Sequence, residues 1–403
     1  MSTGSATMIR RLLRPLVVVV LVATACGGDP AVTAADDPST DGAGGAGAPV
    51  EQIASTPRED VPSALDDATH DELPDPLIDL ARVPSGGPPP DGIRSIDEPR
   101  FQSADAVDWI EPTEAVVVLE LAGEARAYPI QILTWHELVN DTIADVPVTV
   151  SYCPLCNSAL AYDRRLGDRV LDFGTSGNLF NSSMVMYDRQ TESLWTHFDG
   201  TAVAGVLTGA ELATFPIATV SWDDFRSTHP DGLVLTRETG VTRDYGRNPY
   251  EGYDDPATRP FLFDGEIDDR LDPKARVIVV RDPAAPAVAL DRGRLAAERI
   301  VEFEAHGRAL VAVLDPGTAS PLDREEIAAG YDQGAVGVFE NRLDGSPLSL
   351  TRVEAGFRDE SSGRVFDVLG TEVEGGSGRL TPVEHLDTFW FAIAAFDAGV
   401  VLV

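Results

Sequence analysis

The chain has 403 residues and a formal net charge of −35, because 66 acidic side chains face only 31 basic ones. A surface of this sign repels phosphate backbones, so we expect neither DNA nor RNA as a partner. Hydrophobic residues make up 43% of the chain, so a packed core is expected.

The N-terminus has the pattern of an export signal. Three arginines precede a short apolar run, residues 16–22, and small residues then lead to Cys26. The run is too short to span a bilayer, which takes about 20 residues. We therefore predict a lipoprotein signal peptide over 1–26, with a lipid anchor on Cys26 that attaches an extracytoplasmic protein to the membrane. Plain secretion is the alternative if Cys26 is not lipidated.

Residues 27–75 are rich in Gly, Ala, Asp and Pro and have almost no aromatic residues. Such a segment buries too little apolar surface to offset its ordering entropy. We predict a disordered tether there. Roughly 330 residues then remain, which is enough for two ordinary domains.

The first part of the remaining chain predicts strands around one short helix. Runs of β-branched residues indicate strands over 116–121 and 146–152. An apolar stripe of helical spacing predicts a helix over 130–140. Two further strands are expected over 159–162 and 170–173, on either side of a turn.

Further along, residues 184–195 have the pattern of strand, turn and strand. Ser221, followed three residues later by an acidic residue, predicts the start of a helix. The pair Asp231-Gly232 ends that helix and leads into a strand over 233–235. The class is therefore α+β and β-dominated, mainly antiparallel strands with a few short helices.

The folded part has the pattern of an internal duplication. Five blocks recur in the same order: 109–119 with 270–280, 148–154 with 310–316, 191–195 with 362–366, 200–205 with 370–375, and Trp222 with Trp390. We predict two tandem related lobes, a first over 76–265 and a second over 266–403. The second lobe has Asp315 and Thr318 where the first has Cys153 and Cys156. The first lobe would then hold the chemistry, and the second would supply one wall of a cleft.

Cys153 and Cys156 form a Cys-Pro-Leu-Cys motif, and they are the cysteines left to the folded part. Thiols at this spacing can perform redox chemistry, hold a soft metal ion, or form a structural disulfide. A disulfide closing so short a loop stabilises little, which favours a functional role. No helical pattern follows the motif, so a thioredoxin fold is not expected.

Two histidines are candidate partners of the thiols. In the redox interpretation, which requires no cofactor, Cys153 attacks a disulfide or peroxide, Cys156 resolves the intermediate, and His136 lowers the thiol pKa or carries a proton. In the metal interpretation, a Zn or Cu ion is held by both cysteines with His136 and His197. Each histidine also has a structural interpretation: His136 as a hydrogen-bonded core residue, and His197 as a solvent-facing strand residue.

Small and amide residues near 173–183 predict turns that expose backbone N–H groups. They are either pocket-lining residues or a plain loop. The pocket residues we expect are Tyr152, Ser176, Asn178 and Asn181. Tyrosines at 245, 250 and 253 either pack over a cleft or pin the connection between the lobes to the surface.

Several motifs together resemble a bacterial and archaeal family catalogued as domain of unknown function 3179. They are Ala127-Tyr-Pro-Ile130, Trp135-His-Glu-Leu-Val-Asn-Asp141, Tyr152-Cys-Pro-Leu-Cys156, Phe173-Gly-Thr-Ser-Gly177, Met186-Tyr-Asp-Arg-Gln-Thr-Glu-Ser-Leu-Trp195 and Arg243-Asp-Tyr245. The resemblance covers about residues 100–400 and brings no established activity. Some members are named as possible selenoproteins, which implies redox chemistry at one of the two cysteines.

Three functions therefore stay open: a thiol oxidoreductase acting on an unknown redox partner or a small molecule, a metal-binding envelope protein, and a non-enzymatic ligand-binding lipoprotein.

Overall fold

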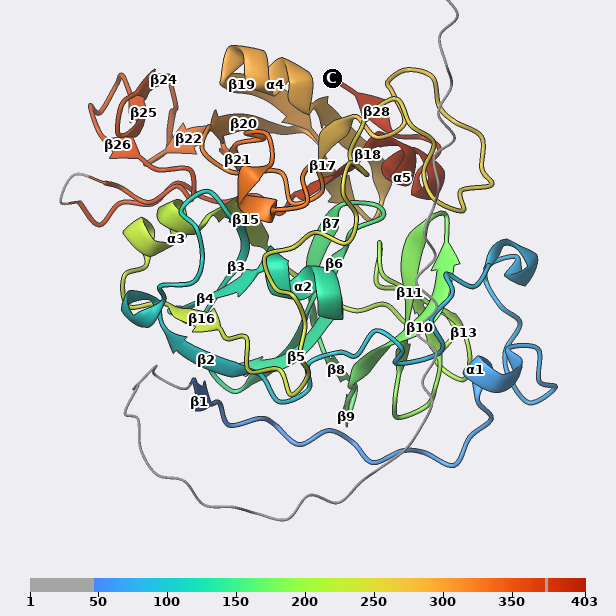
Figure 1. The fold of residues 1–403 in the computed structure, drawn as a ribbon. Helices are drawn as coiled ribbons and strands as arrows, with labels where there is room; N and C mark the ends of the chain where they lie inside the picture. Colours follow the sequence, from blue (N-terminus) through green and yellow to red (C-terminus); the bar gives the residue numbers. More distant parts are fainter. Residues whose placement is uncertain (1–46, 374–375) are drawn as a thin grey trace, which may run out of the picture. The chain divides into compact units, whose positions relative to one another are not determined.

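The computed structural model describes residues 47–373 and 376–403, and residues 45–403 form one compact unit. The predicted signal peptide, Cys26 and the first part of the tether lie outside the described residues. Strands dominate and the helices are short, as predicted (Figure 1). In the described ranges, no helix has the length and apolar character needed to cross a membrane.

The first lobe is built on a run of antiparallel strands around one helix. In chain order these are β3 (Ala115–Leu121), β4 (Glu124–Pro129), α2 (Ile130–His136), β5 (Leu138–Ile143), β6 (Val146–Cys153) and β7 (Ser158–Asp163). Strands β5, β6 and β7 pair in sequence, and β3 pairs with β4. Nearly every residue of β5 and β6 is buried, so both faces of this sheet are covered. The β-branched runs predicted these strands correctly.

The helix predicted over 130–140 is too long. Helix α2 ends at His136, because Glu137 adopts a positive φ of 58° that stops the helical hydrogen bonding. Residues from Leu138 onward form β5 and pair with β6. Pairing of a fully buried strand outweighed the helical spacing of the apolar residues.

The rest of the first lobe is a second group of strands that returns to the first sheet. Its elements are β8 (Arg165–Leu166), β9 (Arg169–Val170), β10 (Phe173–Phe180), β11 (Ser183–Asp188), β12 (Leu194–Thr196), β13 (Ala202–Ala204), β14 (Thr214–Phe215), β15 (Ile217–Ser221), α3 (Trp222–Thr228) and β16 (Leu233–Leu235). The predicted helix start is confirmed, because Ser221 and Asp224 form a reciprocal capping box at α3.

The second lobe repeats this plan. Its elements are β17 (Arg276–Asp282), β18 (Ala285–Asp291), α4 (Arg292–Glu298), β19 (Ile300–Ala305), β20 (Arg308–Asp315), β21 (Ala335–Glu340), β22 (Arg342–Leu343), β23 (Ser346–Pro347), β24 (Leu350–Val353), β25 (Gly356–Asp359), β26 (Val365–Phe366), β27 (Leu386–Phe389), α5 (Trp390–Phe396) and β28 (Val401–Leu402). In both lobes the strand before the last helix pairs antiparallel with the first long strand: β15 with β3, and β27 with β17. The strand after that helix pairs in parallel, β16 with β4 and β28 with β18. The structure therefore has two tandem related lobes.

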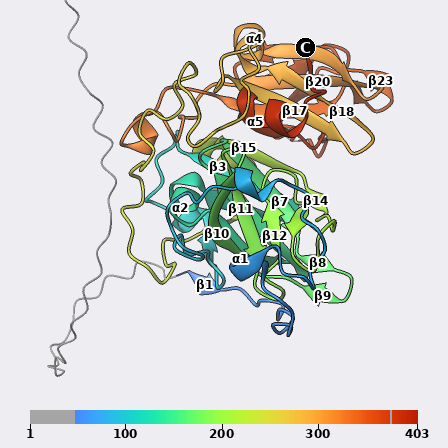
Figure 2. The same ribbon diagram turned by 90° about the vertical axis from the view of Figure 1, so that its right-hand side faces the viewer.

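The lobes exchange equivalent edges where they meet. Strand β27 of the second lobe packs against β7 of the first, and β15 of the first packs against β21 of the second. Two apolar core clusters contain residues of both lobes. Figure 2 shows the second lobe, in orange and red, lying above the first, in green, and both belong to one compact unit. Each lobe thus uses the same two strands for the contact, as the two subunits of a symmetric dimer do, although here both lobes belong to one chain.

The tether predicted over 27–75 must be shortened, because residues 47–75 pack on the first lobe. Strand β1 (Ala48–Pro49) pairs with β2 (Arg100–Ser103). The N–H of Thr56 donates to the carbonyl oxygen of Val170 at 3.0 Å. Helix α1 (Ala64–Asp67) buries Ala64 in an apolar cluster of the first lobe. Residues 47–75 are ordered by backbone hydrogen bonds to the first lobe, which their composition alone does not predict.

One ion pair across the lobe interface generates a stability prediction. Glu120 of β3 accepts a 2.5 Å hydrogen bond from Arg379 of the second lobe, and His229 lies 3.5 Å away. Burial acts to raise the pKa of Glu120, but hydrogen bonds from His229 and Arg379 lower it to about 2. A carboxylate with a depressed pKa contributes stability that is present above its unfolded pKa and is lost as pH falls through about 2.

We expect Glu120→Gln to lower the free energy of unfolding by about 1–3 kcal/mol at pH 7. The difference from the unmodified protein should shrink as the pH falls from 4.5 toward 2. Denaturant unfolding at pH 7 and pH 3 measures both values. An equal difference at the two pH values would contradict this role of the ion pair.

Candidate functional site

The Cys-Pro-Leu-Cys motif forms the turn between β6 and β7. Strand β6 ends at Cys153, the chain turns over 154–157, and Cys153 pairs in register with Ser158 at the start of β7. The turn is closed by the N–H of Asn157, which donates to the carbonyl oxygen of Pro154 at 3.3 Å. The next element is a strand, so the prediction that no thioredoxin-type helix follows the motif is confirmed.

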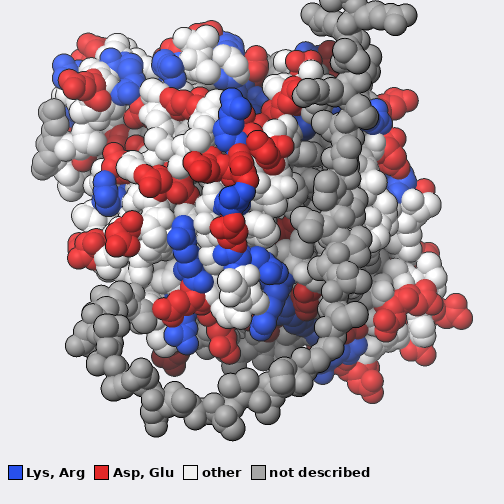
Figure 3. All heavy atoms as spheres, viewed as in Figure 1, with Lys and Arg blue, Asp and Glu red and all other residues white. Residues whose placement is uncertain are grey.

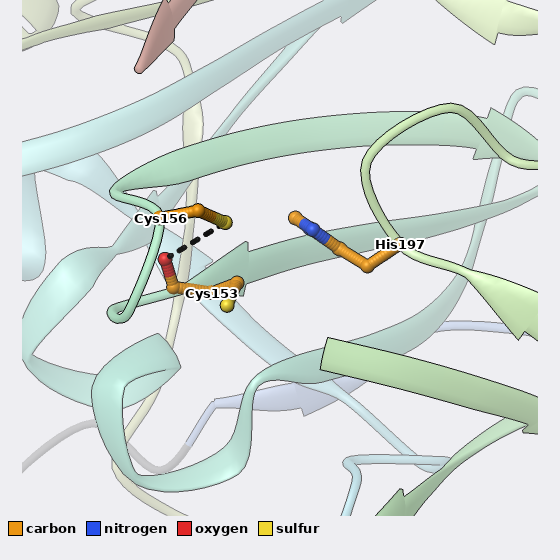
Figure 4. Close-up of side chains that lie close together, drawn as sticks. All are labelled: Cys153, Cys156 and His197. Carbon is orange, nitrogen blue, oxygen red and sulfur yellow. Dashed lines mark hydrogen bonds between the residues drawn. The ribbon is translucent and has the colours of Figure 1, made fainter. Parts of the chain in front are cut away.

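His197 faces this turn from a loop that follows β12 (Figure 4). Its backbone N–H donates to Met184 at 3.0 Å, and its carbonyl oxygen accepts from the Tyr162 hydroxyl at 2.8 Å. The Sγ atoms of Cys153 and Cys156 and a ring nitrogen of His197 all lie within 4.8 Å of one another. The three residues are 1%, 0% and 0% exposed, so the solvent-facing interpretation of His197 is wrong.

The two thiols are free and differ in acidity. Burial raises the pKa of Cys153 well above its ordinary value, and its hydrogen bond to Cys156 adds to the shift. Burial also acts to raise the pKa of Cys156, but hydrogen bonds from Cys153, Ser158 and Ser183 outweigh it and lower that pKa. The Ser183 hydroxyl lies 3.4 Å from Cys156 Sγ. Cys156 is therefore the thiol that ionises first. When protonated, it donates to the carbonyl oxygen of Cys153 at 3.8 Å (Figure 4).

The imidazole of His197 has no partner of its own. Among the described residues, neither Nδ1 nor Nε2 finds a hydrogen-bond partner, although both atoms are buried. Burial is the main cause that lowers the pKa of His197 to about 4, and the charge of Cys153 opposes it in part. The ring is therefore neutral at physiological pH, which is the form that binds metal ions.

The second lobe and the connection between the lobes hold the cysteine turn in place. The carbonyl oxygen of Cys156 accepts from Thr388 Oγ1 at 2.9 Å and from the N–H of Phe389 at 3.1 Å. Thr388 also bonds the Ser158 hydroxyl at 2.8 Å. The Tyr253 hydroxyl donates to the carbonyl oxygen of Leu155 at 3.1 Å. Among these contacts, the sequence analysis predicted a packing role only for the linker tyrosines. No sequence pattern indicated a role for Thr388.

His136 is not part of this group, which corrects its predicted role beside the thiols. Its Nδ1 lies 2.7 Å from the carbonyl oxygen of Arg94, and its Nε2 lies 2.7 Å from the Tyr245 hydroxyl. Both ring nitrogens are thus engaged in the core, as the structural interpretation of His136 predicted. The neighbouring Glu137 is also buried, and burial followed by the charge of Cys153 raises its pKa well above the ordinary value.

The four predicted pocket residues have different partners in the structure. Tyr152 lines a small cavity between the lobes, and its hydroxyl donates to Asn157 at 3.1 Å. The Ser176 hydroxyl donates to the carbonyl oxygen of Val185 at 2.5 Å. Asn178 forms a bridge with Ser85, and Asn181 accepts from Arg82 at 2.8 Å. The polar groups of this segment therefore mainly fasten the N-terminal part of the chain to the lobe.

These features define a β-rich, two-lobed protein with a buried Cys–Cys–His group in one lobe. A family model described as "Protein of unknown function (DUF3179)" matches residues 90–399, and the chain belongs to this family. No curated protein and no solved structure matches the chain.

The unpartnered imidazole generates a prediction for the metal-free protein. A histidine with a folded pKa of about 4 and an unfolded pKa of about 6.5 binds fewer protons when folded. Its presence therefore costs stability that grows as the pH falls from 6.5 to 4, on the order of 3 kcal/mol. His197→Leu should remove this part of the acid destabilisation.

Unfolding free energies at pH 7 and pH 4.5 test this, because the fixed packing cost of the substitution cancels between them. His70→Gln, at an exposed histidine, serves as the control. If His197→Leu loses as much stability on acidification as the unmodified protein, the assignment fails.

Proposed function

We propose that the protein is an exported, lipid-anchored metal-binding protein that holds one soft metal ion between Cys153, Cys156 and His197. The single observation that carries this proposal is the buried His197 imidazole beside two buried thiols, because neither of its nitrogens has a hydrogen-bond partner within residues 47–373 and 376–403. Leaving such a group unpaired costs about 1–3 kcal/mol, and a metal bond would remove the deficit. Export rests on the charged, apolar and small-residue pattern that ends at Cys26.

The size of the group suits an ion. Metal–sulfur and metal–nitrogen bonds of about 2.3 and 2.0 Å place ligand atoms roughly 3.5–4 Å apart. The 4.8 Å limit on the present separations means that only a small inward movement is required. Lowering of the Cys156 pKa by its neighbours also favours the thiolate that a metal ion needs.

The donor set favours Cu⁺ over Zn²⁺. Soft thiolates select Cu⁺ and Zn²⁺ among the common ions. Structural zinc sites have four protein ligands, whereas this group brings together three, with the Ser183 hydroxyl as the nearest further polar group. Outside the membrane, a bare pair of thiols is exposed to oxidation, and a bound ion would keep both as thiolates.

Metal content of the purified protein tests the proposal. Reduced protein incubated with excess Cu⁺ or Zn²⁺ and then desalted should retain one ion per chain, with Cu⁺ winning in competition. Cys153→Ser, Cys156→Ser and His197→Ala should each weaken retention by about tenfold or more, whereas His136→Gln should retain the ion as the unmodified protein does.

Retention of neither ion by the folded, reduced protein would overturn the proposal. Equal loss in the His136→Gln control would point instead to a general effect on folding.

Thiol redox chemistry is the second candidate, and the acidity difference between the thiols is the observation that favours it. The Cys156 thiolate would attack a small disulfide, form a mixed disulfide and release one thiolate. Cys153 would then give up its proton and displace the second thiol, leaving a Cys153–Cys156 disulfide and transferring two electrons to the substrate. This order reverses the predicted one, because burial raises the pKa of Cys153. Both sulfurs are buried, so the substrate would be a small molecule.

The reduction potential of the pair separates the candidates. Equilibration of the metal-free protein with glutathione buffers should give a potential above about −300 mV if the dithiol is a redox centre. A potential well below that value, or no oxidation by glutathione disulfide, would exclude this second function. Neither result affects the metal measurement.

A further inference from the structure

The interface between the lobes contains a cavity of about 330 Å³ that the metal site does not use. Most of its wall is apolar and comes from both lobes: Val118, Leu121 and Ala218 from the first, and Val338, Phe339 and Leu369 from the second. The ion pair of Glu120 and Arg379 also lines it, and these two charges balance each other. Several of these side chains are fully buried, so the cavity reaches into the core. A dry apolar cavity of about 150 Å³ already binds benzene, so a two-ring molecule fits here.

A second, polar chamber adjoins the first. It has a volume of about 30 Å³, and it shares Ile217 and His385 with the larger cavity as common walls. Three of its lining residues have a buried polar atom with no partner among the described residues: Arg276 Nε, Gln333 Oε1 and Asp387 Oδ1. The space suits one hydroxyl or amide group, or one or two water molecules.

The charges around the polar chamber are already balanced. Arg276, whose side chain is 8% exposed, lies 3.5 Å from Asp254. Asp387 lies 3.1 Å from Arg292. A charged ligand group would have no opposite charge left to pair with in a buried setting, which is costly. One unpartnered donor beside two unpartnered acceptors instead complements an uncharged group that both donates and accepts.

We propose that this cleft binds a small apolar molecule carrying one uncharged hydrogen-bonding group, a hydroxyl or a primary amide. The apolar body lies between Val118 and Leu369 in the larger chamber. The polar group passes His385 and bonds Arg276, Gln333 and Asp387. This site lies beside the Cys–Cys–His group, because Tyr152 and Asn157 line the polar chamber and flank the two cysteines. It uses none of the three side chains of that group.

Calorimetric titration with 2-naphthol and with naphthalene tests the proposal on the whole protein. We expect one 2-naphthol per chain and about tenfold weaker binding of naphthalene, because naphthalene leaves the polar atoms unpaired. Gln333→Met should remove most of that preference. Ala218→Leu, which fills the apolar chamber, should weaken 2-naphthol binding by at least about tenfold. Ala297→Leu, on the exposed face of α4, is the matched control and should bind normally.

Nuclear Overhauser effects between 2-naphthol and the methyl groups of Val338 and Leu369 locate the ligand in the unmodified protein, so the test does not depend on the folding of any variant. Failure of 2-naphthol to saturate the protein, or its location elsewhere, would overturn the proposal. Equal affinity for naphthalene would overturn the assignment of the polar group.

Discussion

The carbonyl oxygen of Cys156 accepts hydrogen bonds from Thr388 and Phe389, and these bonds hold the cysteine turn of one lobe against a strand of the other. They exist because β27 of the second lobe packs against β7 of the first. The equivalent contact, between β15 of the first lobe and β21 of the second, is also present. The position of both sulfurs therefore depends on the second lobe, although that lobe has no cysteine. Separating the lobes would expose two shared apolar clusters and release the turn at once.

The two lobes differ most at the equivalent turn, and this difference explains their division of roles. In the first lobe a tight turn over 154–157 joins β6 and β7, and it presents two thiols to His197. In the second lobe the chain between β20 and β21 takes the longer path of residues 316–334, and Pro321 and Gln333 from this path line the polar chamber. One copy thus supplies the two thiols of the Cys–Cys–His group, and the other supplies a wall of the interlobe cavity.

Much of the fold could be predicted from local patterns, because each has a local physical cause. The β-branched runs, the Ser221 cap and four of the five repeated blocks correspond to observed elements, whereas the block over 370–375 falls in no helix or strand of the described residues. The predicted helix was too long because the state of residues 138–140 is decided by their pairing with residues 149–151 of β6, nine to thirteen residues further along the chain.

The partners of the thiols could not be chosen from the sequence. His136 and His197 are both histidines near buried aromatic residues, and only the pairing of β11 with β12 brings the loop of His197 over the turn. Thr388 lies more than 200 residues from the motif, and its role exists only across the lobe interface. The contacts of residues 47–75 likewise depend on strand edges supplied by distant parts of the chain.

X-ray absorption spectroscopy of the copper-loaded protein at the copper edge tests the proposed metal site most directly. We expect a shell of two sulfur atoms at about 2.2–2.3 Å and one imidazole nitrogen at about 2.0 Å, and we expect His197→Ala to remove the nitrogen contribution. A spectrum without sulfur neighbours, or one unchanged by His197→Ala, would contradict the proposed site.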